Sequence, residues 1–369
     1  MVRWLHFLGA MEQREGLRWS WKLGSLAHIP VRVHVTMLIL VGWIGVSYAV
    51  RGASLTAALT GIALIACVFA IIVVHELAHA LVARRFGVET QDIVLLPIGG
   101  MSRMEELPER PREELLVSLA GPAVNVVLAG ILALIVWGTG GAFRPSEALS
   151  LRGAFTAQLL WINVGLAVFN LLPAFPMDGG RALRALLTLK LGRPRATRVA
   201  AAIGKMLAAL FVLLGITGNW LLVLIGVFVW MAATQEAAQV TLRSTLEGIP
   251  VARAMIRQIE TLDAEQPIAE ATDQMIASGH KQLPVVDHGR VTGIVRARDL
   301  VAMRGLPHAE VASAMRMGIP RVEATDTLDH AIDILKRARD DVALVVEHDA
   351  VVGILTLEQV AEYAAIHAR

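Results

Sequence analysis

Disulfide bonds are excluded from this 369-residue chain, because its one cysteine, Cys67, has no partner and lies inside an apolar run. Net charge is also small: 34 Lys and Arg against 32 Asp and Glu leave a formal charge of +2. Aspartate is scarce before residue 249, where only Asp92 and Asp178 occur. A cleavable signal peptide is not expected, since Met1–Gly24 is polar and rich in Trp and Arg.

The chain has an apolar part and a polar part. Hydrophobic residues make up 55% of it and the mean hydropathy is +0.59, yet no apolar run after about Ile249 could cross a bilayer. A transmembrane helix needs about 20 mostly apolar residues. We therefore predict a multi-span α-helical membrane protein, with about six transmembrane helices, followed by a soluble α/β part. The predicted spans are Val33–Val50, Leu55–Ala83, Leu115–Trp137, Phe155–Leu172, Val199–Ile216 and Trp220–Ala233.

Basic residues between the spans predict the orientation. The loops Arg84–Glu114 and Gly179–Arg198 hold five and six Lys or Arg, whereas Arg51–Ser54 and Gly138–Ala154 hold one and two. Cytoplasmic loops carry the excess of Lys and Arg. Both termini are therefore predicted to be cytoplasmic, in a chain expected to cross the plasma membrane several times.

Beyond the spans, one sequence unit occurs twice. Gln282–Val301 and Asp341–Val360 each contain an apolar strand, a turn, a second strand with Gly-Ile and then a helix, and amphipathic helices precede both. A repeat of about 60 residues in β-α-β-β-α order predicts two like modules packed together. The repeats resemble a tandem pair of cystathionine-β-synthase (CBS) domains, which implies a regulatory module that often binds adenine nucleotides such as ATP or AMP.

The motif that such CBS domains carry, Gly-x-x-Thr/Ser-x-x-Asp, is incomplete in both repeats. The first has the acid, Asp299, but Arg296 in the hydroxyl position; the second has the hydroxyl, Thr356, but Gln359 in place of the acid. Arg296, Asp299 and Thr356 are the candidate nucleotide contacts, and Arg296 could meet a phosphate directly. Homodimerisation through the CBS pair is the competing role.

These patterns together predict five consecutive segments. They are a cytoplasmic N-terminal segment (1–32), a transmembrane domain (33–240), a linker (241–248) and the two CBS repeats (249–308 and 309–369).

Ionisable residues stand near the end of the second predicted span, in "VVHELAHALVARR" (Val73–Arg85). His75 and His79 are i and i+4, so both imidazoles share one helix face, as two zinc ligands require, and Glu76 is available as a general base. His75 lies about 14 Å before the interface marked by Arg84. Charged groups inside a bilayer cost free energy and usually face a functional cavity. Simple solvation by the headgroups is the competing interpretation.

A third ligand is expected from another span, because a catalytic zinc ion usually has three protein ligands and one open position. Asp178 follows the fourth predicted span in "FNLLPAFPMDGGR" (Phe169–Arg181), where Pro173 and Pro176 interrupt the helix. Non-helical backbone at membrane depth is tolerated only where protein or a cavity surrounds it. The second and fourth spans run in the same direction, so Asp178 and His79 should lie near the same side.

The two motifs together resemble the site-2 protease family of intramembrane zinc metalloproteases, one branch of which carries CBS domains behind the protease core. The resemblance implies that His75, His79 and Asp178 bind one Zn²⁺ per chain and that Glu76 activates the water. It also implies that Asn170 holds the substrate or the oxyanion.

A third feature of that family is present in the third predicted span as "AGPAVN" (Ala120–Asn125). We assign Gly121 and Pro122 to helix packing and Asn125 to a polar contact near the substrate cavity.

The segment Asp92–Met104 is apolar but too short to span the membrane. Pro97, Gly99 and Gly100 argue against a helix, which favours a re-entrant loop or hairpin that could pair with an extended substrate by strand addition. An ordinary interfacial loop is the alternative.

The implied function is regulated intramembrane proteolysis. The substrate would be a single-span membrane protein, such as an anti-sigma or pro-sigma factor, and no nucleic-acid partner is expected. Two rivals remain open. One is a CBS-gated ion transporter or channel that uses the same His, Glu and Asp side chains as an ion path, although it has no special need for Glu directly after the first His. The other is an inactive scaffold, against which the intact residue set speaks.

Overall fold

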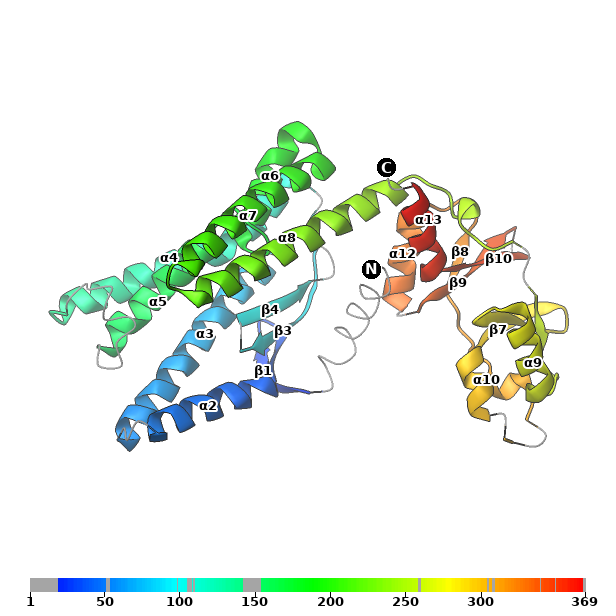
Figure 1. Ribbon diagram of the computed structural model, residues 1–369, viewed down its shortest axis with the longest axis horizontal. Helices are drawn as coiled ribbons and strands as arrows, with labels where there is room; N and C mark the ends of the chain where they lie inside the picture. Colours follow the sequence, from blue (N-terminus) through cyan, green and yellow to red (C-terminus); the bar gives the residue numbers. More distant parts are fainter. Residues whose placement is uncertain are drawn as a thin grey trace. The chain divides into compact units, whose positions relative to one another are not determined.

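The computed structural model describes residues 19–50, 54–97, 99–104, 108, 110–141, 154–257, 260–303, 305–306, 309–338, 340–348 and 350–367. The first 18 residues of the expected N-terminal segment and residues 142–153 of the loop after the third predicted span lie outside the described residues. The chain forms two compact units, Met1–Ala238 and Gln239–Arg369, which we call the membrane unit and the C-terminal unit (Figure 1).

Within the described residues, four helices are long and apolar enough to cross a membrane: α3 (Leu55–Arg85), α4 (Pro111–Gly138), α7 (Arg193–Ile216) and α8 (Trp220–Leu246). The other two predicted spans form shorter helices, α2 (Thr36–Val50) with 15 residues and α5 (Phe155–Asn170) with 16. A membrane protein with several apolar helices is therefore confirmed, whereas the count of about six spans is not. The first predicted span is shortened because the chain is still a β-strand up to His34.

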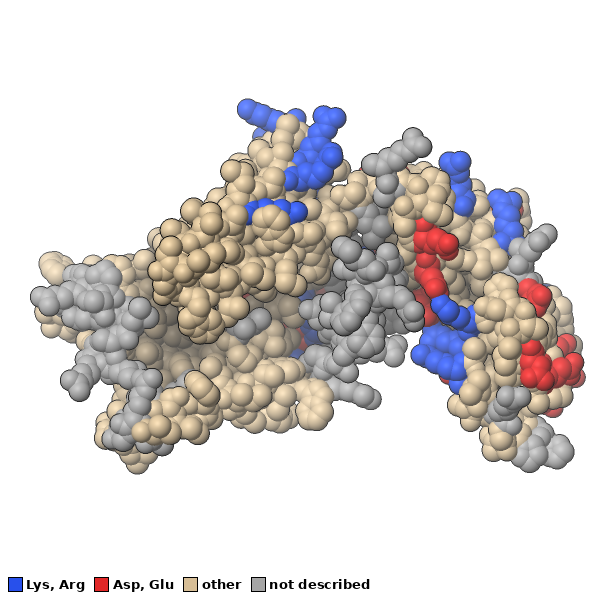
Figure 2. Space-filling model, in the orientation of Figure 1, with Lys and Arg blue, Asp and Glu red and all other residues tan. Residues whose placement is uncertain are grey.

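The last two spans extend beyond their predicted bounds. Helix α7 begins at Arg193 with a proline in its first turn, where the missing N–H costs no intrahelical bond. Helix α8 continues to Leu246, through most of the segment 241–248 that the sequence suggests as a linker. In Figure 2 the membrane unit is largely uncharged on the visible face, and its Lys and Arg gather where α6 (Asp178–Leu191) meets α7.

A four-stranded sheet lies beside the helices in the order β1-β2-β3-β4. Its strands are β1 (Ser20–Leu26), β2 (Ile29–His34), β3 (Thr90–Leu96) and β4 (Gly99–Met104). Strands β2 and β3 are parallel and the other pairs antiparallel. The hairpin predicted over Asp92–Met104 is thus confirmed as β3–β4, with Gly99 at φ 143° in its turn. Helix α3 packs against β4.

Helix α4 lies at the centre of the membrane unit, where it packs against α3, α5 and α6. A buried ion cluster ties it to two other helices. Arg184 of α6, 1% exposed, donates through Nε to Glu114 of α4 at 2.8 Å and through Nη1 to Glu236 of α8. Its guanidinium also lies 5.2 Å from the ring centroid of Phe175. This cluster carries no motif by which the sequence could reveal it.

The C-terminal unit contains the two predicted modules. One has the sheet β5-β6-β7 (Leu262–Asp263, Gln282–Asp287, Arg290–Arg296) with helices α9 (Ile268–Ser278) and α10 (Ala297–Met303). The other has the sheet β10-β9-β8 (Ala350–Thr356, Val342–Glu347, Arg321–Glu323) with α12 (Leu328–Ala338) and α13 (Leu357–His367). A short 3-10 turn, η2 (Val251–Arg253), precedes the first module and α11 (Val311–Ala314) precedes the second. The predicted β-α-β-β-α repeat is confirmed.

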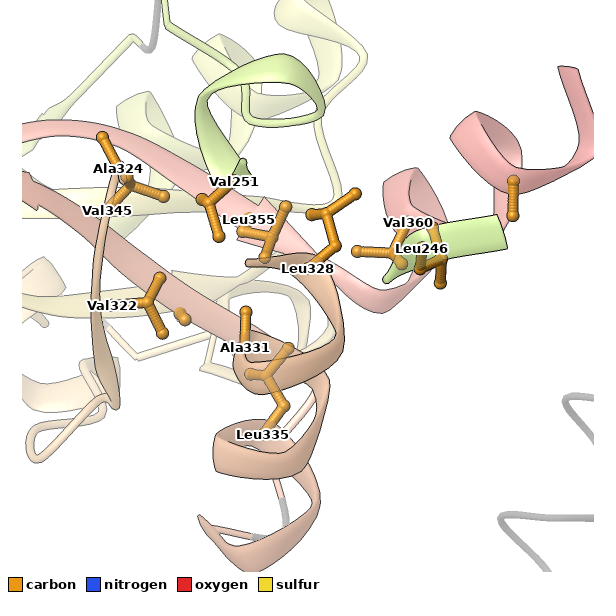
Figure 3. Packing of buried hydrophobic residues seen from close by; sticks show 12 residues of the cluster. Leu246, Val251, Val322, Ala324, Leu328, Ala331, Leu335, Val345, Leu355 and Val360 are labelled. Carbon is orange, nitrogen blue, oxygen red and sulfur yellow. The ribbon is translucent and has the colours of Figure 1, made fainter. Parts of the chain in front are cut away.

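Each module has its own apolar core. In the second, Val345 and Leu355 of the sheet meet Leu328 and Leu335 of α12, all fully buried (Figure 3). Leu246, the last residue of α8, is 0% exposed in the same cluster. Helix α8 therefore ends as part of this core.

The Arg184 cluster predicts a large stability effect. Replacing Arg184 by Ala leaves Glu114, 1% exposed, without its cation. Breaking a buried ion pair in this way costs about 3–5 kcal/mol. We expect the unfolding midpoint of the detergent-solubilised protein to fall by several degrees. Arg195→Ala, which removes an exposed arginine of α7, is the control and should leave the midpoint unchanged; equal midpoints for both variants would contradict the prediction.

Candidate metal centre

Helix α3 carries two buried histidines on one face. Its N-terminus is capped by Ser54, whose Oγ accepts a hydrogen bond from the N–H of Ala57 at 3.2 Å. His75 and His79 are 6% and 5% exposed, and their ring centroids lie 4.8 Å apart at an interplanar angle of 80°. The i, i+4 spacing thus brings both rings to the same place in the packed interior.

Asp178 reaches the same place from an interrupted helix. Helix α5 ends at Asn170, residues 171–177 form bends and turns, and α6 begins at Asp178 itself. The glycine that follows allows this tight path, because a Cβ on Gly179 would lie 2.3 Å from the carbonyl oxygen of Leu171. The interruption predicted from the two prolines is confirmed, and its result is an aspartate that is 7% exposed.

The three side chains converge on one point. Asp178 Oδ2 lies 3.2 Å from Nε2 of His75 and 3.2 Å from Nε2 of His79, and the two Nε2 atoms are 3.1 Å apart. Two donors bound at 2.0–2.1 Å to one tetrahedral ion are about 3.3 Å apart. Two imidazole nitrogens and a carboxylate oxygen at this spacing fit a zinc ion, both by donor chemistry and by size.

The opposite nitrogen of His79 is fixed by α4. His79 Nδ1 donates to the backbone carbonyl of Val117 at 2.6 Å, which leaves the lone pair of Nε2 facing the cluster. His75 Nδ1 is buried without a hydrogen-bond partner among the described residues. A metal-ligating histidine almost always has such a second partner, so the two imidazoles are held unequally.

Gly121 of α4 makes room for both imidazoles. A Cβ at this position would lie 2.3 Å from His79 Nε2 and 2.6 Å from His75 Nε2, far inside contact distance. Gly121 is expected from the sequence to serve helix packing, and the surface that it packs against is the donor cluster of His75, His79 and Asp178. The motif AGPAVN marks this position in the sequence, but only the packing of α4 against α3 shows which side chains need the space.

Glu76 points to the hairpin. It is half-buried, and its Oε2 accepts a hydrogen bond from Ser102 Oγ of β4 at 2.7 Å. Gly100 of the same strand lies so close that a Cβ there would be 2.9 Å from Glu76 Cγ. Neither Ser102 nor Gly100 belongs to the histidine motif, and only the packing of β4 against α3 shows that both lie next to Glu76.

The two asparagines singled out in the sequence are not part of the donor cluster. Asn170 is the half-buried last residue of α5. Asn125 is 1% exposed, and neither of its side-chain amide atoms has a hydrogen-bond partner within the described ranges. Its backbone carbonyl accepts from Asn163 Nδ2 at 2.7 Å, which joins α4 to α5.

The candidate nucleotide contacts of the C-terminal unit are already engaged. Arg296 donates to Asp340 Oδ1 at 3.0 Å and also bonds Asp341, while Arg316 donates to Asp340 Oδ2 at 2.7 Å. Burial alone would raise the pKa of the Asp340 carboxyl, but the hydrogen bonds from Arg316 and from the Asp341 backbone N–H hold it below its usual range.

In the second repeat, Thr356 and Gln359 cap helix α13 reciprocally. The N–H of Gln359 donates to Thr356 Oγ1 at 3.2 Å, and the N–H of Thr356 donates to Gln359 Oε1 at 3.1 Å. This pattern is a capping box. It gives Gln359, which stands where the motif has an acid, a structural role.

Asp299 of the first repeat lies in the first turn of α10, where its carboxylate is 3.6 Å from Arg298 Nε.

Two family models match the chain. The model described as "Peptidase family M50" matches residues 63–155 and 152–214, and the model "CBS domain" matches residues 251–304 and 310–366. The first covers both motifs that carry the donor cluster, and the second covers both repeats of the C-terminal unit.

Relatives of the whole chain are named as proteases. "Zinc metalloprotease MJ0392" of Methanocaldococcus jannaschii is 33% identical over 92% of this chain and 94% of that protein. "Putative zinc metalloprotease Rip3" of Mycobacterium tuberculosis is 31% identical over 79% of this chain and 78% of that protein. A solved structure, "Site-2 Protease from Methanocaldococcus jannaschii", is 34% identical, covers 59% of this chain and 95% of that one, and has a TM-score of 0.44.

The close approach of Gly121 predicts that a single methyl group disturbs the donor cluster. In Gly121→Ala the new Cβ must displace both imidazoles, so we expect bound zinc, measured by atomic emission on the purified protein, to fall well below one ion per chain. Gly130→Ala is a matched control on the same helix, because a Cβ there meets nothing within 4 Å. Full zinc occupancy in both variants would show that the histidines do not need this space.

Proposed function

The chain belongs to peptidase family M50 and carries two CBS domains, and we propose that His75, His79 and Asp178 hold its zinc ion while Glu76 serves as general base. The protein is a zinc metallopeptidase, and its two motifs resemble those of site-2 proteases. The observation that carries the residue assignment is the buried triad of donor atoms, all within 4.8 Å of one another.

A zinc ion bound there would lower the pKa of a bound water to about 7 and polarise the scissile carbonyl. The chain's own residues supply the proton transfers. Glu76 follows His75 directly, is half-buried, and takes the proton of the attacking water before delivering it to the nitrogen of the leaving amine. Asn170, at the end of α5 and before the bends that lead to Asp178, holds the substrate or the developing oxyanion. Asn125 of α4, 1% exposed, acts as a polar contact near the substrate cavity.

The substrate binds in an extended form along β4. Strand β4 is the last strand of its sheet, and no described strand pairs with its outer edge. An intact helix hides its carbonyl groups within its own hydrogen bonds, whereas a strand exposes them. Because β4 also packs on α3 beside Glu76, an added strand would bring a peptide bond close to the general base.

Because the apolar helices place the protein in a membrane, its substrates are limited to chains that enter the same membrane. We propose a single-span membrane protein cut in or near its transmembrane segment, of the kind of an anti-sigma or pro-sigma factor. The relatives named as proteases favour this function over the ion path.

Both termini and the CBS pair are proposed to be cytoplasmic. The basic residues Lys190, Arg193, Arg195 and Arg198 lie around the α6–α7 junction, which Figure 2 shows as the basic end of the membrane unit. Lys and Arg accumulate on the cytoplasmic side. The remaining segment bounds stay as predicted from the sequence: a transmembrane domain over 33–240 and CBS repeats over 249–308 and 309–369.

Adenine nucleotide is proposed as the effector of the CBS pair, with Arg296, Asp299 and Thr356 as its contacts. Arg296 lies beside two carboxylates and Thr356 caps helix α13, so a bound nucleotide would compete with these contacts. A homodimer through the CBS pair is compatible with the same residues.

The role of Glu76 is tested by co-expression with tagged single-span membrane proteins. Glu76→Gln keeps the shape of the side chain but removes the base, and loss of a general base costs about 10²–10⁴-fold in rate. We expect a cleavage fragment with wild type that is absent with Glu76→Gln, while both proteins retain zinc. Fragment formation at the same rate in both would overturn the assignment of Glu76.

Nucleotide binding is tested by isothermal titration of the full chain in detergent with AMP and with ATP. We expect a saturable heat that Thr356→Val weakens, since that change removes the only hydroxyl in the motif position of either repeat. Thr245→Val is the control, because the Thr245 hydroxyl donates locally, to the backbone carbonyl of Thr241, and its loss should leave the heat unchanged. The absence of heat at millimolar nucleotide would remove the effector proposal and leave dimerisation.

A further inference from the structure

Ser102 contacts the general base from outside the histidine motif. Its Oγ donates to Glu76 Oε2 at 2.7 Å, across 26 residues of sequence, and both side chains are partly buried. A hydroxyl that donates to a carboxylate makes a charge-assisted hydrogen bond, which is stronger than one between neutral groups.

A second observation shows that the contact follows from the packing of β4. Gly100 is two residues before Ser102, so both side-chain positions face the same side of the strand. A Cβ on Gly100 would lie 2.7 Å from Ile72 Cγ2 and 2.9 Å from Glu76 Cγ. The backbone of β4 is therefore pressed against the turn of α3 that bears Glu76, and only glycine permits that approach.

The hydrogen bond restricts a flexible side chain. Glutamate has several rotatable bonds and loses rotamer freedom when it is held in one orientation. With Oε2 bound to Ser102, the other oxygen, Oε1, remains available to accept a proton. A Cβ on Gly100 would lie 3.5 Å from this oxygen.

We propose that Ser102 is a positioning residue for Glu76: it holds one carboxylate oxygen so that the other faces the attacking water. The proposal rests on the proposed function of Glu76 as general base. It also links proton transfer by Glu76 to substrate binding, because Ser102 belongs to β4, the edge strand proposed to receive the substrate. A substrate strand on the outer edge of β4 uses backbone groups, while the Ser102 side chain points away from that edge to α3.

The kinetic test compares Ser102→Ala with Ser102→Thr. The probe is fluorescein-labelled casein in detergent micelles, an extended chain that needs no unwinding. Ser102→Ala should lower kcat about tenfold or more, the loss expected for a hydrogen bond to a charged group, with KM unchanged. Ser102→Thr, which keeps the hydroxyl, should recover most of that loss.

Two controls separate positioning from a structural effect. Thr60→Ala removes an exposed hydroxyl of α3 that donates to the carbonyl of Thr56, and its kcat should equal that of wild type. Bound zinc should be the same in Ser102→Ala and wild type. In a Glu76→Gln background, Ser102→Ala should cause no further loss, because the oxygen that it orients no longer acts as a base.

Each result decides one of the two proposals. If zinc-loaded wild type is no more active than Glu76→Gln, the proposal that Glu76 is the general base is wrong. If wild type exceeds Glu76→Gln but Ser102→Ala matches wild type, the inference about Ser102 is wrong. A rise in KM, a loss of zinc, or a failure of Ser102→Thr to recover activity would also overturn it, because each assigns Ser102 to substrate binding or to packing instead.

Discussion

The convergence of two imidazole nitrogens and one carboxylate oxygen, 3.1–3.2 Å apart, is the constraint on which the membrane unit depends. Such groups lose hydration when they are buried, and burial is tolerated when they bind one another or a metal ion. Much of the surrounding architecture serves to bring them together. Helix α3 supplies the histidines, and the interrupted chain between α5 and α6 supplies Asp178.

Helix α4 determines whether that convergence is possible. Its backbone fixes His79 through the Val117 carbonyl, and Gly121 leaves the space that the rings occupy. The same helix is tied to α6 by the buried pair of Glu114 and Arg184. Since α6 begins with Asp178, this pair also helps to hold the carboxylate at a fixed distance from the histidines.

The C-terminal unit uses polar contacts in a different way. Asp340 is satisfied by two arginines, Arg296 and Arg316, and by the backbone N–H of Asp341. The bonds to Asp340 occupy Arg296, the arginine that a phosphate would otherwise meet. The phosphate of a bound nucleotide would therefore have to replace the carboxylate at Arg296. Arg296 and Gln359, the residues that depart from the motif, therefore both have structural partners within the unit.

Several features followed from the sequence alone, because they depend on local spacing. The i, i+4 histidines, the interruption at Pro173 and Pro176, the β3–β4 hairpin and the repeated β-α-β-β-α unit each arise from the order of neighbouring residues. The sequence did not determine the number of spans, since hydropathy does not show that the first apolar segment begins as a β-strand.

Only the tertiary structure decided which distant residues meet. Ser102 and Arg184 lie outside the motifs of the sequence, and Gly121 lies in a motif whose contacts the sequence does not show. Each gains its role from a helix or strand that packs against it. The sequence determines a membrane peptidase with a pair of CBS domains. The environment of Glu76 and the histidines was decided by packing, because contacts between elements depend on three-dimensional proximity that no local pattern encodes.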